Sequence, residues 1–204
     1  MLTLTFETSN FGASAALFED NALLCARAWR EPHGQGAYLV KELKEMATSQ
    51  GKRLLDAGQV ITTVGPGSFT GQRIGLAVAR TLAFAGALDV WGVDSFTWMA
   101  AGFMHAHKNF RAPFMVCLDT GRADRFCQLF STEGTPLAPP CILGLDACET
   151  ALPQDAALVG QAWAQHPRTL STHWRPHAQD LILVPRERQS PLAPLYLREA
   201  NTTL

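Results

Sequence analysis

The strongest chemical signal in the sequence is a glycine-rich turn, GPGSFTG, at residues 65–71. Glycine permits a sharp strand-to-helix turn without a Cβ penalty, and the proline between two glycines stiffens it. Ser68 is placed to cap the helix that follows, because its hydroxyl accepts a backbone N–H bond. A Walker phosphate loop needs GxxxxGK[ST], and the sequence has neither that spacing nor the lysine.

A dinucleotide-binding turn is a closer match. Gly65, Gly67 and Gly71 fit a GxGxxxG variant, and Asp89 or Asp94 lies about 20 residues further on, where such sites place an acid. Such turns normally open a βαβ unit, however, whereas this one follows three expected strands and a helix. A nucleotide- or dinucleotide-dependent enzyme that uses this turn is the alternative function.

Small residues recur at every fourth position through the helix after the turn: Gly67, Gly71, Gly75, Ala79 and Ala83. Glycine inside a helix costs about 0.5–1 kcal/mol relative to alanine, so this stripe predicts that something packs closely against it. The helix either packs on its own sheet or docks on another subunit, and the spacing alone leaves both open. Arg73 and Arg80 lie roughly on one face of this helix, where they would pair with charges across the interface.

Histidines and cysteines form no comparably specific pattern. His173 and His177 are four residues apart, but Pro176 breaks the helix that would align them on a metal ion. Cys117 lies in an apolar stretch, which predicts a buried, inert thiol rather than a nucleophile. We therefore expect no metal site and no catalytic residue.

The elements that must position these residues follow from hydrophobic periodicity, which predicts an α/β chain. Strands are expected at about 2–7, 12–18, 22–29, 59–64, 90–93, 114–118, 125–130 and 156–159. Helices are expected at about 35–50, 69–85 and 95–107, the last with Ser95 as its N-cap. Residues 132–153 are expected to be mainly loop. We expect an N-terminal lobe of residues 1–107 and a smaller C-terminal lobe of residues 108–204, loop-rich at 131–190.

Composition limits the partners. Lys and Arg number 17 against 18 Asp and Glu, so the chain lacks the basic excess of a protein that grips nucleic acid alone. Five cysteines without a CxxC pair favour reduced thiols. The N-terminus lacks the pattern of a signal peptide, and no apolar run approaches the roughly 20 residues that cross a bilayer. We expect a soluble cytoplasmic protein that does not contact a membrane.

The run GPGSFTGQRIGLAVARTLA at residues 65–83 resembles the signature of the TsaB (YeaZ) family, bacterial tRNA threonylcarbamoyladenosine biosynthesis subunits similar to the glycoprotease-like TsaD (Gcp) proteins. Three further pieces agree in order. Residues 4–17 resemble the opening strands of the family, residues 116–122 the start of its second lobe, and residues 194–198 its PxYLR ending. The resemblance is clear over residues 1–130 and at the end, and slight from 131 to 190.

The resemblance implies an actin-like ATPase (ASKHA, ribonuclease-H-like) fold with two lobes of mixed sheets flanked by helices. It implies a non-catalytic scaffold or activating subunit that pairs with a TsaD-like catalytic subunit, works with a TsaE-like ATPase, and meets tRNA only through the complex. A homodimer is the alternative assembly, and a protease-like protein a further alternative function. Pairing would use helices 35–50 and 68–85 through Tyr38, Lys41, Glu42, Gly67, Ser68, Phe69, Gly71, Arg73, Ile74, Gly75, Ala77, Val78 and Arg80.

The catalytic relatives hold a metal ion through paired histidines on their first long helix. At the corresponding place this chain has His33 with Ala37 four residues later, and one imidazole does not replace the pair. Glu7, Thr8 and Asp119 stand where actin-like proteins place groups near a nucleotide phosphate and its metal, although the family usually has Asp at the first position. Either acid could instead cap a turn. We expect no cofactor, with ATP or ADP and Mg at a lobe or subunit interface as the alternative.

Overall fold

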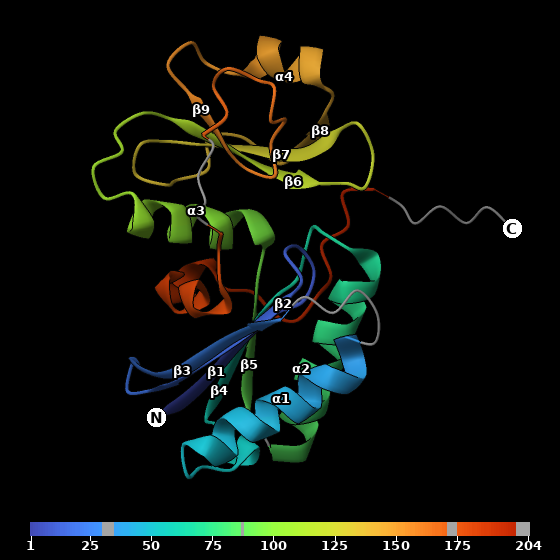
Figure 1. Cartoon of the computed structure of the whole chain (residues 1–204), viewed down its shortest axis with the longest axis vertical. Coiled ribbons are helices and arrows are strands. Elements are labelled where there is room, and N and C mark those ends of the chain that lie inside the picture. The colour runs from blue at the N-terminus through green and yellow to red at the C-terminus, as the bar shows by residue number, and fades with distance from the viewer. Residues whose placement is uncertain (30–34, 87, 171–174, 199–204) are drawn as a thin grey trace, which may run out of the picture.

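The structure, a computed structural model, describes residues 1–29, 35–86, 88–170 and 175–198. Two β-sheets lie one above the other with helical segments between them (Figure 1). The first sheet has the strand order β3-β2-β1-β4-β5. Its strands are β1 (Leu2–Glu7), β2 (Ala13–Glu19), β3 (Ala22–Trp29), β4 (Gln59–Thr63) and β5 (Asp89–Val93).

The first three strands form the expected antiparallel meander, and β1 then pairs in parallel with β4, and β4 with β5. The alternating residues Leu2, Leu4 and Phe6 enter the core on one side of the sheet. Both faces of β1 are covered, since all six of its residues are buried. A central strand of this kind ends in a well-fixed position, which matters for the residues that follow Glu7.

Two helices, α1 (Gln35–Ser49) and α2 (Phe69–Gly86), cover one face of the first sheet. Leu39, Leu43 and Met46 of α1 are fully buried in the same core as β1, which confirms the helical spacing seen in the sequence. A short 3-10 turn, η1 (Leu54–Asp56), follows α1. Among the described residues, no helix has both the length and the apolar character needed to cross a bilayer.

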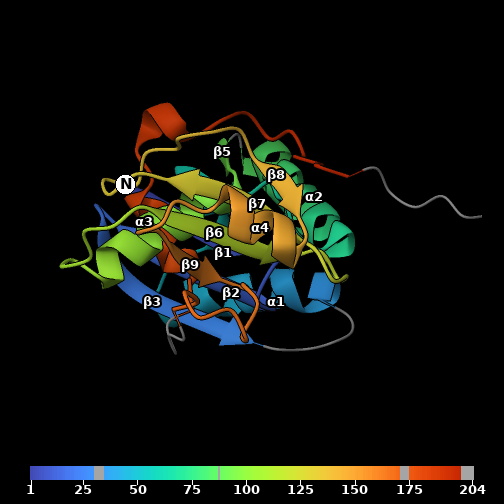
Figure 2. The same cartoon turned by 90° about the horizontal axis from the view of Figure 1, so that it is seen from above.

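The second sheet has the order β8-β7-β6-β9, with β6 (Phe114–Asp119), β7 (Arg125–Phe130), β8 (Cys141–Leu143) and β9 (Ala157–Gly160). Helix α4 (Leu145–Ala151) packs on its outer face, where Cys148 and Leu152 join the core beneath (Figure 2). The expectation that residues 132–153 are mainly loop missed this short strand and this short helix. The three-residue strand and seven-residue helix are too short to show a clear period in the sequence.

Helix α3 (Ser95–Ala106) lies between the two sheets, and its Trp98, Phe96 and Phe103 are fully buried there. The N-cap is Asp94 rather than the predicted Ser95, because the Asp94 carboxylate accepts a hydrogen bond from the Thr97 backbone. This leaves Ser95 buried as the first helical residue.

The chain returns to the first sheet after the second sheet is complete. The 3-10 helix η2 (Ala178–Leu183) packs on α3 and on the first sheet, and η3 (Arg186–Arg188) follows it. Ser190 then forms an isolated antiparallel bridge with Gly92 of β5. The predicted division at 107/108 therefore needs correction, because residues 178–190 belong spatially with the first sheet. Hydrophobic periodicity is local and does not reveal such a return.

Candidate functional site: the paired helices and the cleft between the sheets

The turn after β1 is fastened to the start of α2. The Thr8 hydroxyl donates to the Gly71 carbonyl at 2.7 Å, and the Ser68 backbone N–H donates to the Ser9 carbonyl at 2.7 Å. The Ser68 hydroxyl in turn accepts from the Gly71 backbone at 3.3 Å, which confirms the predicted cap. The first turn of α2 is thus held from inside the lobe.

The small-residue stripe of α2 faces this turn and not a partner. A Cβ added at Gly71 would lie 2.1 Å from the Thr8 carbonyl oxygen, and one at Gly75 would lie 2.7 Å from the Thr8 hydroxyl. A Cβ at Gly67 would lie 2.6 Å from the Ser9 carbonyl oxygen. The close backbone approach was predicted correctly, but its assignment to another subunit was wrong for these three glycines.

The opposite face of α2 is open to solvent. Its centre is Ala77, and Phe84, seven residues later, is 94% exposed. Exposed or half-exposed residues along this face are Thr70, Arg73, Ile74, Ala77, Val78, Arg80, Thr81 and Phe84. Phe84 and Thr81 were missed in the sequence, although their helical spacing from Ala77 could have identified them.

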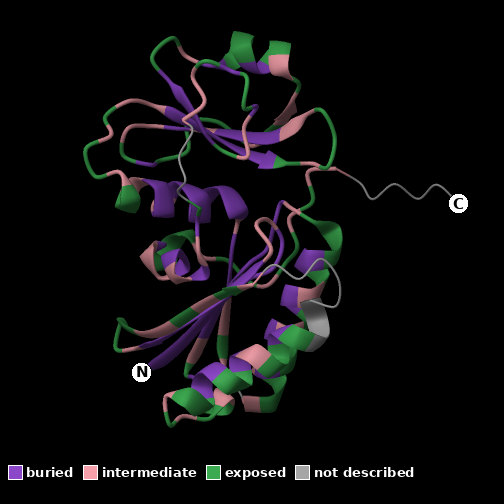
Figure 3. Ribbon diagram, in the orientation of Figure 1, coloured by how far each residue is buried: buried purple, intermediate pink, exposed green. Residues whose placement is uncertain are grey.

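Helix α1 lies beside α2 and also carries exposed residues (Figure 3). Tyr38 and Val40 are 45% and 47% exposed, which leaves two large apolar side chains in solvent. Glu42 is partly buried and accepts a hydrogen bond from Arg27 of β3 at 2.9 Å, and Lys41 lies 3.7 Å from Glu45. Of the predicted residues on this helix, Tyr38 and Lys41 are therefore exposed, while Glu42 mainly secures α1 to the sheet.

The two arginines of α2 have partners within the chain. The Arg73 guanidinium lies 3.7 Å from the centre of the Phe69 ring, and Arg80 donates to the Leu192 carbonyl at 3.0 Å. Phe69 also contacts Tyr196, with 5.4 Å between the ring centres. These cations are less free to pair across an interface than the sequence suggested.

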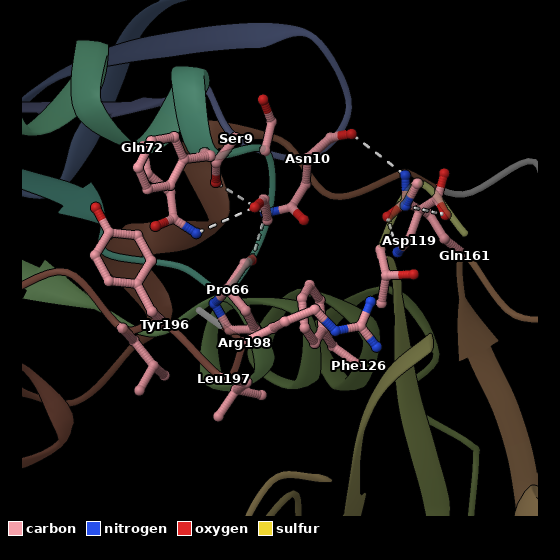
Figure 4. A pocket seen from close by; sticks show the side chains of 16 residues that line it. Ser9, Asn10, Pro66, Gln72, Asp119, Phe126, Gln161, Tyr196, Leu197 and Arg198 are labelled. Carbon is pink, nitrogen blue, oxygen red and sulfur yellow. Dashed lines mark hydrogen bonds between the residues drawn. The ribbon is translucent and has the colours of Figure 1, made fainter. Parts of the chain in front are cut away.

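A cavity of about 590 Å³ lies between the two sheets. Figure 4 shows Ser9 and Asn10 on one side of it, Asp119 and Gln161 at another, and Tyr196 near Gln72. The Gln161 amide joins the lobes, because it accepts from the Asp119 backbone at 2.9 Å and donates to the Asn10 carbonyl at 3.3 Å. The cavity is thus partly bridged by the chain itself.

The predicted nucleotide-site residues are engaged in turns. The Glu7 carboxylate is buried and accepts from the Ser9 backbone, from the Ser9 hydroxyl at 2.7 Å and from the Asn10 backbone at 3.0 Å. Burial raises the pKa of Glu7, and these hydrogen bonds oppose that rise. Asp119 accepts from the Gly121 backbone at 3.0 Å. Backbone N–H groups that could bind phosphate are therefore occupied by the two acids.

Within the described residues, no group of three or more His, Cys, Asp or Glu side chains is arranged to hold a metal ion. His177 accepts from the Gln179 backbone at the start of η2, so it acts as a cap. The predictions for His33 and His173 lie outside the described residues.

Comparison with known proteins gives a consistent set of relatives. The family model described as "TsaD: tRNA N6-adenosine threonylcarbamoyltransferase" matches residues 37–167. The tRNA threonylcarbamoyladenosine biosynthesis protein TsaB of Escherichia coli (strain K12) is 33% identical over 107 residues, which are 50% of this chain and 44% of that protein. The protein of the same name in Bacillus subtilis (strain 168) is 25% identical over 105 residues, 52% of this chain and 46% of that protein. The matched segments thus span less than half of either relative.

The solved structure "YeaZ from Pseudomonas aeruginosa" has a TM-score of 0.78 and 22% identity, and the match covers 96% of this chain and 99% of that one. This likeness is one of fold. It confirms the predicted two-lobed α/β fold over nearly the whole chain.

Proposed function

Because this chain belongs to the TsaB (YeaZ) family, within the wider TsaD family, we propose that it is a non-catalytic subunit of a bacterial tRNA threonylcarbamoyl transferase complex. It pairs with a TsaD-like catalytic subunit, acts together with a TsaE-like ATPase, and meets tRNA only as part of that complex. The near-neutral charge supports indirect tRNA contact, since 17 basic residues face 18 acidic ones.

The observation that carries the proposal is the exposed face of α2, which lies beside α1. Ala77 and Thr81 are small, so another helix can approach α2 closely, and the exposed Phe84 lies on the same face of α2. Tyr38 and Val40 are further exposed apolar side chains on α1. Large exposed apolar residues grouped on one surface are typical of protein-binding sites. A stable interface of this kind buries about 1,200–2,000 Å² in total.

Two observations support a role without chemistry of its own. The family resemblance implies that the catalytic relatives hold a metal ion through a histidine pair, and this chain has His33 with Ala37 four residues later. The side chains of Glu7, Thr8 and Asp119 also form hydrogen bonds with the backbone of nearby segments. The subunit would then act thermodynamically, by binding best to the active conformation of its partner.

The direct test is co-elution of the purified chain with a TsaD-like subunit in size-exclusion chromatography with light scattering. We expect a 1:1 complex, and threonylcarbamoyl transfer to tRNA by the mixture but not by this chain alone. If the isolated chain forms a homodimer through the exposed face of α2, the TsaD-like subunit should displace one copy and form the mixed dimer instead. Saturable dinucleotide or ATP binding to the isolated chain, together with no complex, would instead favour the enzyme alternative.

A further inference from the structure

Residues 190–198, which we call the crossing segment, run from the first sheet past the start of α2 to the second sheet (Figure 1). They include the PLYLR ending noted in the sequence. We propose that the crossing segment is an intramolecular clamp that holds the two lobes together across the cleft and restricts their opening.

The first end of the clamp is anchored on the first lobe by backbone bonds. Ser190 and Gly92 exchange hydrogen bonds of 2.8 Å and 2.7 Å, and the Leu195 N–H donates to the Val64 carbonyl at 2.7 Å. This end of the segment therefore extends the edge of the first sheet.

The middle of the clamp forms one wall of the cleft. The cavity is lined on this side by Leu195, Tyr196, Leu197 and Arg198 (Figure 4). The Leu195 carbonyl lies so near Gly65 that a Cβ there would be 2.7 Å away, and Tyr196 packs on Phe69. The segment thus occupies space at the point where the glycine-rich turn meets the cleft.

The far end is anchored on the second lobe by an ion pair. Arg198 donates to the Asp124 carboxylate, which lies in the loop between β6 and β7 and also accepts from the Thr120 hydroxyl at 2.6 Å. Both side chains of the pair are about three-quarters buried, with 25% and 27% exposure. The pair spans the two lobes, so opening the cleft must break or stretch it.

The test is hydrogen exchange measured by mass spectrometry on the full chain. It compares the wild type with variants in which one charge of the Arg198–Asp124 pair is reversed, and with a variant in which both are. Arg198→Asp and Asp124→Arg each place like charges together, and the double variant pairs them again in the opposite order. Thr120 keeps a hydrogen bond to the backbone carbonyl of residue 124 in every variant. Arg186→Ala is the control, because Arg186 stacks on Trp91 within the first lobe, 3.0 Å from the ring centre.

We expect exchange at cleft residues 9–12 and 119–122 to accelerate about tenfold in each single variant, while β1 stays protected. The double variant should return to wild-type exchange, and Arg186→Ala should leave these loops unchanged. The proposal fails if residues 190–198 exchange faster while the cleft loops do not. The segment could then detach without opening the cleft, so it would not hold the lobes together. The proposal also fails if the folded double variant stays open. Tyr196→Ala should open the cleft by the same measure if a charge reversal prevents folding.

Discussion

The Thr8 hydroxyl donates a 2.7 Å hydrogen bond to the Gly71 carbonyl, and this contact fixes the end of the central strand against the first turn of α2. Thr8 comes directly after β1, whose residues are all buried, so it cannot move away without disturbing the core. The glycine at position 71 is therefore a requirement of the fold of this lobe.

Gly71→Ala should destabilise the protein by about 2 kcal/mol. Overpacking costs up to about 3 kcal/mol, and the higher helix propensity of alanine offsets about 1 kcal/mol of that cost. The new methyl group would lie 2.1 Å from a backbone oxygen. Urea unfolding measures the change. Gly144→Ala is the matched control, since its Cβ meets nothing within 4 Å, and it should lose at most about 1 kcal/mol as a poorer N-cap. Equal losses at both positions would contradict the packing described.

Ala77→Arg should abolish pairing with a TsaD-like subunit and leave the isolated chain folded. The residue is exposed at the centre of the open face of α2, where a long charged side chain would keep a second helix away. Light scattering detects the complex, and circular dichroism checks the fold. Ala106→Arg, at the exposed end of α3, is the control and should pair normally. Normal pairing by Ala77→Arg would remove this face from the interface.

Glu7→Gln should make the stability of the protein less dependent on pH. Burial raises the pKa of Glu7 above its ordinary value of 4.5, so the folded state keeps a proton that the unfolded state releases. The wild type should therefore lose stability as the pH rises from 4.5 through the raised pKa. Glutamine keeps the acceptor oxygen and has no charge to bury, so this decline should disappear.

Urea unfolding at several pH values between 4 and 8 measures the effect of Glu7→Gln. Glu133→Gln serves as a comparison, because hydrogen bonds from the Thr132 and Ser131 hydroxyls lower the pKa of this exposed carboxyl. Its contribution has the opposite sign and is lost as the pH falls. If the unfolding free energies of the wild type and of Glu7→Gln change with pH in parallel, the pKa of Glu7 is not raised by burial.

Cys25 and Cys141 should react with a thiol reagent in the folded protein, and Cys117, Cys127 and Cys148 only after unfolding. The first two are partly or fully exposed, whereas the other three are buried in the core under the second sheet. Burial also raises the pKa of Cys148 to about 11, which suppresses its thiolate. Counting labelled thiols by mass spectrometry checks this. Cys141→Ser should remove one fast-reacting thiol, and rapid labelling of Cys117 would contradict the packing.

Local pattern was enough to predict most of the fold. Alternation in residues 2–6 and helical spacing in residues 39–46 identified β1 and α1, because side-chain period follows directly from backbone geometry. The GPGSFTG turn was found from its glycine and proline residues, which favour a sharp strand-to-helix turn. The short β8 and α4 were missed, since neither is long enough to show a period.

The sequence by itself determined that α2 must meet another backbone at its glycine stripe, because only close approach explains glycines inside a helix. It did not determine which backbone. The tertiary structure assigned that contact to Thr8 and Ser9, left Ala77 and Phe84 facing solvent, and brought Arg198 to Asp124 across the cleft. Spacing along the chain encodes which face of an element is special, but the partner of that face depends on segments that meet only after folding.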